Sequence, residues 1–306
     1  MCDFTQHHWQ TLIERDFEQL LKIALFEDTD VAGDLTCLAL VPDTAQGSAV
    51  VVARTEGVLA GIPLVPLILS SVDHTLVWKP VLKDSEKLTC GTIIGTIRGS
   101  ARGLLIAERP VLNFLGRLSG IATLTRRYVD TVQSTGVHIY DTRKTTPGWR
   151  RLEKYAVACG GGKNHRTGLY DAVLIKDNHL ALGQQGSEPF SPAEAVVRAK
   201  EFLRQRLTVL PVADCPIVEI EVDTLEQLRE VLPVEPDIVL LDNMSPTQIM
   251  EAIQIRNAVK PNVQLEASGG INLETVRAVS ETGVERISVG ALTHSAVSLD
   301  FGLDWE

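Results

Sequence analysis

Residues 217–242 read IVEIEVDTLEQLREVLPVEPDIVLLD, and this stretch identifies the fold class. Its two ends, Ile217–Val222 and Asp237–Asp242, are short apolar runs of the kind found in buried strands. Between them, Thr224–Leu232 has the apolar spacing of a helix, and Thr224 is a residue type favoured at a helix N-terminus. A strand, a helix and a second strand in succession predict a βαβ unit with parallel strands.

The same alternation continues on both sides of this stretch. Further strands are expected at Val137–Asp141, Ala172–Lys176, Val263–Ala267 and Arg286–Val289, and further helices at Ser245–Val259 and Leu273–Thr282. Six such units favour an incomplete TIM-like α/β barrel over an open doubly wound sheet. No G-x-G-x-x-G motif follows a strand, which argues against dinucleotide binding. The preceding part has a mixed α and β pattern and ends in a long helix expected at residues 110–134, with Pro110 in its first turn.

Composition excludes several classes of protein. The 306 residues carry 29 basic and 39 acidic side chains, a net charge of −10, which is the wrong sign for a general nucleic-acid binder. Five scattered cysteines do not suggest a disulfide framework or a zinc site. The longest uncharged run, residues 57–72, is too short for a membrane span, and no signal peptide is visible. We therefore expect a cytoplasmic protein with neither a membrane nor a nucleic-acid partner.

Positive charge is concentrated in residues 138–179, which hold eight cations and four acids. Arg143 and Lys144 follow one predicted strand and Lys176 ends another. The carboxyl ends of strands form the active face of α/β barrels, so these cations predict an anion site there. Three further cations, Arg150, Arg151 and Lys154, lie on the helix expected at 148–159. We interpret them as a solvated face of that helix. His165 follows a glycine-rich turn and, taken alone, is more typical of a structural histidine.

Acidic and glycine-rich strand ends complement these cations. Glu219 and Glu221 share one face of their strand, and Asp242 ends the next strand. Such carboxylates bind Mg²⁺, a hydroxyl or a developing positive charge, or else form interior salt bridges with Lys144 or Lys176. The turns Ser268–Gly270 and Val289–Ala291 follow the last two strands, where exposed backbone N–H groups near a helix start form a phosphate site.

Several motifs together resemble those of the quinolinate phosphoribosyltransferase family. The most specific are DTRKTTPGWR (141–150) and CGGGKNHRTGLYDAVLIKDNH (159–179), and others follow in family order along nearly the whole chain. The resemblance implies transfer of the phosphoribosyl group of phosphoribosyl pyrophosphate (PRPP) to quinolinate with decarboxylation, in NAD biosynthesis, with Mg²⁺ as cofactor. It implies an N-terminal α/β sandwich (1–120), an incomplete α/β barrel (121–295), and a tail (296–306) that could pack back on the sandwich.

The resemblance also implies residue roles and an assembly. The catalytic set is Lys144, Lys176, Glu221 and Asp242, with Glu221 and Asp242 bound to Mg²⁺ directly or indirectly. The remaining substrate-binding positions are Arg109, Thr142, Arg143, His165, Arg166, Ser268, Gly269, Gly270, Val289, Gly290, Ala291 and His294. Arg109 would act from a neighbouring subunit, so a homodimer or a higher homo-oligomer with shared active sites is expected.

Three other functions remain open at this level. One is a related phosphoribosyltransferase acting on another aromatic ring acid, which would release no CO₂. Another is a Schiff-base aldolase with Lys144 or Lys176 as nucleophile. The third is a non-catalytic protein that binds anions with the same fold.

Overall fold

The structure is a computed structural model that describes residues 3–185, 188–206 and 216–306. The chain forms two compact units, each assembled from three separated segments. The barrel unit comprises Met1–Thr5, Arg127–Arg143 and Lys163–Gly290. The sandwich unit comprises Gln6–Arg126, Lys144–Gly162 and Ala291–Glu306.

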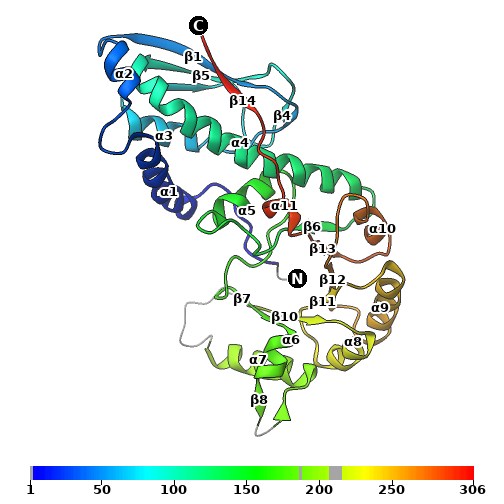
Figure 1. Ribbon diagram of the computed structural model, residues 1–306. Coiled ribbons are helices and arrows are strands. Elements are labelled where there is room, and N and C mark those ends of the chain that lie inside the picture. Colours follow the sequence, from blue (N-terminus) through cyan, green and yellow to red (C-terminus); the bar gives the residue numbers. More distant parts are fainter. Residues whose placement is uncertain (1–2, 186–187, 207–215) are drawn as a thin grey trace. The chain divides into compact units, whose positions relative to one another are not determined.

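The barrel unit contains the predicted parallel sheet (Figure 1). Six strands pair in the order β6-β13-β12-β11-β10-β7, and every pairing is parallel. In the described ranges no ladder joins β6 to β7, so the barrel is incomplete. This confirms the predicted fold class. The strands are β6 His138–Tyr140, β7 Ala172–Ile175, β10 Ile217–Val222, β11 Ile238–Asp242, β12 Gln264–Ser268 and β13 Arg286–Ser288.

Local sequence explains both the strands and the starts of two of the helices. β11 is buried at four of its five positions, because a parallel strand is covered on both faces. The Thr224 side chain accepts a hydrogen bond from the Gln227 backbone N–H at the start of α8, and Ser245 does the same with Gln248 at α9. The helices of this unit are α6 Asp177–Leu182, α7 Pro192–Arg206, α8 Leu225–Val231, α9 Pro246–Val259 and α10 Val276–Ser280.

The N-terminal segment of the chain contributes to the barrel core. Phe4 is 5% exposed and forms one apolar cluster with Ala172, Ile217 and Ile238. These three partners are the first residues of β7, β10 and β11. Phe4 therefore packs at the amino end of the barrel, opposite to the edge where the strands end.

The sandwich unit has a four-stranded antiparallel sheet in the order β14-β1-β5-β3. β14 Phe301–Trp305 lies beside β1 Gln46–Ala53, so the C-terminal tail forms an edge strand of this sheet (Figure 1). The other strands are β3 Val77–Pro80 and β5 Ile93–Ser100, and β2 Gly57–Val58 pairs with β4 Lys87–Leu88. The helices are α1 Thr11–Thr29, α2 Leu35–Leu40, α3 Leu64–Val72, α5 Arg150–Cys159 and α11 Ala291–His294.

The long helix differs from its prediction. α4 spans Ala101–Val132, so Pro110 lies inside the helix and the expected start at Pro110 is wrong. Leu104 and Ala107 are buried and continue the apolar stripe of Val111 toward the N-terminus, so burial of this face favours the longer helix. None of the helices in the described part of the chain is long and apolar enough to cross a bilayer. Cys37, Cys90 and Cys159 are free thiols, while Cys2 and Cys215 lie outside the described residues.

Candidate active site

All six strands of the barrel unit deliver predicted site residues at their carboxyl ends. Parallel strands end at a common edge, so these residues share one face of the sheet. Asp242 and Ser268 are paired in register at the ends of β11 and β12. The Val289 N–H donates to the Tyr140 carbonyl at 2.9 Å, which joins the ends of β13 and β6. The residues placed at this edge are Thr142, Arg143, Lys176, Glu221, Asp242, Ser268, Gly269, Gly270, Val289 and Gly290.

Three of the predicted catalytic residues form one charged group. The Lys176 ammonium pairs with the Glu221 carboxylate, across the neighbouring strands β7 and β10. Burial raises the pKa of Glu221; the Lys176 charge partly offsets this, and Asp242 and Asp177 add to the rise. Asp242 is thus close enough to act on Glu221 electrostatically. The salt bridge between Glu221 and Lys176, expected as one alternative, is present.

Two arginines bring positive charge close together. Arg166 is 6% exposed, and its guanidinium donates to the Ala172 carbonyl at 3.3 Å. Burial lowers the pKa of Arg166, and the positive charge of Arg143 lowers it further. In the described residues no carboxylate lies within ion-pair distance of Arg166. The carboxylates of Glu219 and Asp171 oppose both effects on the pKa of Arg166, and an incoming anion would relieve the repulsion between Arg143 and Arg166 further.

The backbone that carries Arg166 is held by a buried carboxylate. Asp141 follows β6 and is fully buried. It accepts a hydrogen bond from the Asn164 side chain at 2.7 Å and another from the His165 backbone N–H at 2.8 Å. The glycine-rich turn before Lys163 thus leads into a segment with a fixed backbone.

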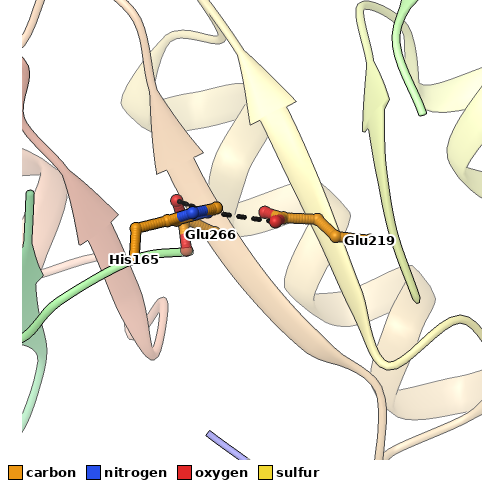
Figure 2. A group of neighbouring side chains, drawn as sticks. All are labelled: His165, Glu219 and Glu266. Carbon is orange, nitrogen blue, oxygen red and sulfur yellow. Dashed lines mark ion pairs between the residues drawn. The ribbon is translucent and has the colours of Figure 1, made fainter. Parts of the chain in front are cut away.

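The His165 ring faces the barrel interior, between Glu219 of β10 and Glu266 of β12 (Figure 2). Its Nε2 atom lies 3.0 Å from Glu219 Oε2 and 3.5 Å from Glu266 Oε1. Its Nδ1 atom accepts a hydrogen bond from the Arg166 backbone N–H at 2.8 Å. From the sequence, Glu219 is grouped with Glu221 among carboxylates that bind Mg²⁺ or a hydroxyl or form interior salt bridges, and its contact with His165 is not predicted. Glu266 has no predicted role, although it stands two residues before Ser268 and has the same period-two spacing.

These three buried side chains have the composition of a metal site, yet their hydrogen bonds do not fit one. The ligand atoms lie within 4.8 Å of one another. A metal-binding histidine normally donates its second ring N–H to an acceptor, whereas here Nδ1 accepts from Arg166. The proton of a neutral ring is then on Nε2, which points at the carboxylates. Glu266 is in addition paired with Arg286 at 2.8 Å.

The turn after β12 requires glycine. Gly269 has φ +90°, and a Cβ atom there would lie 2.2 Å from Asn243 Oδ1. Gly270 also has a positive φ, +63°. The expected helix start close to this turn is wrong, because α10 begins only at Val276. Backbone N–H groups of the turn itself are what the structure offers to a phosphate.

The remaining predicted residues belong to the sandwich unit. Arg109 lies on α4 with a 70% exposed side chain. Lys144 is exposed, and its carbonyl accepts a hydrogen bond from Thr293 Oγ1 at 2.7 Å. Ala291 and His294 are the first and last residues of α11. None of these four side chains is buried within the sandwich unit, so each is accessible to a ligand there.

The fold is that of the α/β-barrel class, and the cations after its strands give this protein a site suited to anionic ligands. Sequence comparison makes this specific. Residues 34–119 match the family model described as quinolinate phosphoribosyl transferase, N-terminal domain, and residues 121–304 match that of the C-terminal domain. The chain belongs to the quinolinate phosphoribosyltransferase family.

Individual relatives agree over most of their length. The nicotinate-nucleotide pyrophosphorylase [carboxylating] of Mycobacterium leprae is 42% identical over 288 residues, 93% of this chain and 95% of the relative. The quinolinate phosphoribosyltransferase [decarboxylating] 2b, mitochondrial, of Nicotiana tabacum is 38% identical over 94% of this chain and 82% of the relative. The structure of the nicotinate-nucleotide pyrophosphorylase from Francisella tularensis has a TM-score of 0.87 at 34% identity, covering 99% of this chain and 100% of that one.

Proposed function

We propose that this protein transfers the phosphoribosyl group of PRPP to quinolinate and releases CO₂, giving nicotinate mononucleotide and pyrophosphate. The observation that carries the proposal is the Lys176–Glu221–Asp242 group at the carboxyl edge of the barrel. Arg143 and Arg166, which act on each other electrostatically, supply further positive charge in the same unit. The names of the relatives agree with this reaction. The aldolase and the non-catalytic alternatives have no comparable support.

The two arginines suit quinolinate. This substrate carries two carboxylates, both ionised near neutral pH. A guanidinium binds a carboxylate through two parallel hydrogen bonds. Arg143 and Arg166 lie within electrostatic range of each other, and their mutual repulsion disappears when a dianion is bound. Thr142 and His165 precede these arginines in sequence. Thr142 is part of the proposed subsite, and the buried His165 ring accepts the Arg166 N–H and so contributes to it through Arg166.

The carboxylate group and the glycine turns suit PRPP. As pyrophosphate leaves, the ribose acquires oxocarbenium character, which the carboxylates of Glu221 and Asp242 stabilise electrostatically. The turns Ser268–Gly270 and Val289–Ala291, with Lys144 and His294, bind the phosphates. Val289 takes part through its position in the turn, because its own N–H is bonded to the Tyr140 carbonyl. Oxygen ligands are those that Mg²⁺ prefers, so Glu221 and Asp242 fit this ion and would hold it. When bound, Mg²⁺ would neutralise the charge of the leaving pyrophosphate.

The chemical steps need no nucleophilic side chain. The quinolinate ring nitrogen attacks the anomeric carbon while the bond from that carbon to the pyrophosphate oxygen breaks. The product is a pyridinium, which accepts the electron pair left when the adjacent carboxylate departs as CO₂. Lys176 stabilises the resulting ylide, and a proton then replaces the lost carboxylate.

A homodimer or a higher homo-oligomer with shared sites is part of the proposal. Arg109 is 70% exposed on α4, as a residue that reaches into a neighbouring subunit must be. Mixing Arg109→Ala protein with Lys176→Ala protein should restore part of the activity, because mixed dimers would contain one intact site. The cytoplasmic location stays a prediction, since the tobacco relative is named as mitochondrial.

The decisive experiment is a discontinuous assay of the purified protein with quinolinate, PRPP and Mg²⁺. We expect nicotinate mononucleotide and CO₂ in equal amounts, and no CO₂ when nicotinate replaces quinolinate. Lys144→Ala and Arg166→Ala should each lower kcat/KM at least 100-fold. Arg204→Ala is the matched control, because this side chain is 78% exposed. Turnover close to wild type in both variants, with the fold retained, would refute the assignment of the site.

A further inference from the structure

A chain of polar contacts that is exposed at Asp3 and buried beyond it links the N-terminal segment to the centre of the barrel. Arg286 of β13 is 1% exposed. Its Nη1 atom donates to Asp3 Oδ1 at 3.0 Å and to the Tyr140 hydroxyl at 2.9 Å. Its Nε atom donates to Glu266 Oε2 at 2.8 Å. The Tyr140 hydroxyl donates in turn to Asp3 Oδ2 at 2.9 Å, so Asp3 is bound through both oxygens.

Aromatic rings enclose the same chain of contacts. The guanidinium carbon of Arg286 lies 3.7 Å from the centroid of the Tyr140 ring and 5.1 Å from that of the Phe4 ring. The Phe4 ring stacks on the imidazole of His165 with centroids 4.2 Å apart. Asp3 and Phe4 therefore contact the two ends of one network, Asp3 through Arg286 and Phe4 through His165.

The network ends on the backbone of Arg166. Glu266 accepts a hydrogen bond from Arg286 through Oε2. Its Oε1 lies 3.5 Å from His165 Nε2, a charge contact without hydrogen-bond geometry, and Glu219 Oε2 lies nearer to the same nitrogen at 3.0 Å. The opposite nitrogen, Nδ1, accepts the Arg166 N–H. Both ring nitrogens are thus engaged inside the protein. A tilt of the imidazole would displace the peptide that carries the Arg166 side chain.

We propose that Asp3 and Phe4 are positioning residues: through Arg286, Glu266 and the His165 ring they orient Arg166 for quinolinate. The proposal rests on the proposed function of Arg166. Charge and packing both support it. Asp3 and Glu266 both pair with the guanidinium of Arg286, so removing the Asp3 charge would change the balance of charge around a side chain that is 1% exposed. Small displacements of a residue that orients a substrate have large effects on catalysis.

The test compares Phe4→Leu and Asp3→Asn with wild type in steady-state kinetics. We expect KM for quinolinate to rise at least fivefold in both variants while KM for PRPP stays within twofold. Phe4→Tyr keeps the stacked ring and is the conservative control, with KM for quinolinate close to wild type. Thermal unfolding of each variant checks that the fold is retained. An unchanged KM for quinolinate, or an equal rise in both KM values, would overturn the proposal.

A second measurement does not depend on activity. Nitrogen-15 NMR of histidine-labelled protein, assigned with His165→Gln, should show the neutral tautomer of His165 with its proton on Nε2. Phe4→Leu should shift these resonances. A doubly protonated ring, or a proton on Nδ1, would contradict the positioning role. Wild-type protein that makes no nicotinate mononucleotide would refute the proposed function instead, and the two failures are distinguishable.

Discussion

The Arg117–Glu153 pair gives the sharpest stability prediction in the sandwich unit. Glu153 is fully buried on α5, and its Oε1 atom lies 2.6 Å from Arg117 Nη2. Its carboxylate also accepts the Thr146 backbone N–H at 3.1 Å and the Thr146 hydroxyl at 2.9 Å. Arg117 donates in addition to the Ala296 carbonyl at 2.9 Å. The pair therefore joins α4 and α5 to the loop that carries Lys144 and to the segment that follows α11.

Replacing Arg117 with alanine leaves the Glu153 carboxylate buried without its charge partner. Breaking a buried ion pair in this way costs about 3–5 kcal/mol. The Arg117 side chain is 22% exposed, so water can reach part of the vacated space and the lower end applies. We expect Arg117→Ala to lower the free energy of unfolding by about 3 kcal/mol. Glu153→Gln, which keeps an acceptor for Thr146, should cost about 1–3 kcal/mol.

Urea unfolding followed by circular dichroism measures both variants. Arg229→Ala is the control: Arg229 pairs with Glu251 at 3.1 Å, but both side chains are about half exposed, so its loss should cost less than about 1 kcal/mol. The kinetics of Arg117→Ala should show a raised KM for PRPP, because the Lys144 loop loses an anchor. If Arg117→Ala were no more destabilising than Arg229→Ala, the reasoning from burial would be wrong.

Three further predictions concern the barrel unit. Gly269→Ala should raise KM for PRPP at least tenfold, because the added Cβ atom would clash with Asn243. At Gly270 an added Cβ atom meets no atom within 4 Å, so Gly270→Ala should cost only the backbone strain of about 1–2 kcal/mol in stability. An equal rise in KM for PRPP in the two variants would contradict this reasoning. Burial opposes ionisation of Asp3, but hydrogen bonds and the charge of Arg286 hold its pKa below the ordinary value of 3.8. Asp3→Asn should therefore lower the free energy of unfolding at pH 7, and lower it progressively less as the pH falls below 3.8. Urea unfolding across that pH range measures this. Chelation with EDTA should abolish turnover and added Mg²⁺ should restore it; full activity in EDTA would count against a Mg²⁺ requirement.

Local patterns were sufficient for the order of elements in the barrel. The apolar runs at Ile217–Val222 and Ile238–Asp242 are strands because parallel strands are buried on both faces, and this leaves a continuous apolar signal. The capping residue Thr224 marks the start of the helix between them in the same local way. Since parallel strands all end at one edge, the placement of Lys176 and Asp242 on a common face followed from chain order.

Local sequence patterns did not predict which charged side chains are buried. Arg150, Arg151 and Lys154 were interpreted as a solvated helix face, but Lys154 is fully buried, so for this residue the interpretation is wrong. Neighbouring Glu153 is buried as well, against Arg117, which lies 36 residues earlier in the chain. Helical periodicity describes which residues share a face, but not which distant segment covers that face.

The amino acid order thus established the parallel α/β architecture, the charged strand ends and the family, because each is written in short-range spacing or in contiguous motifs. Packing established the rest. Asp3 contacts Arg286 across 283 positions, Phe4 stacks on His165, and the final strand Phe301–Trp305 pairs with Gln46–Ala53. Such contacts depend on the shape and charge of surfaces that exist only after the chain has folded, and a one-dimensional pattern contains no record of them.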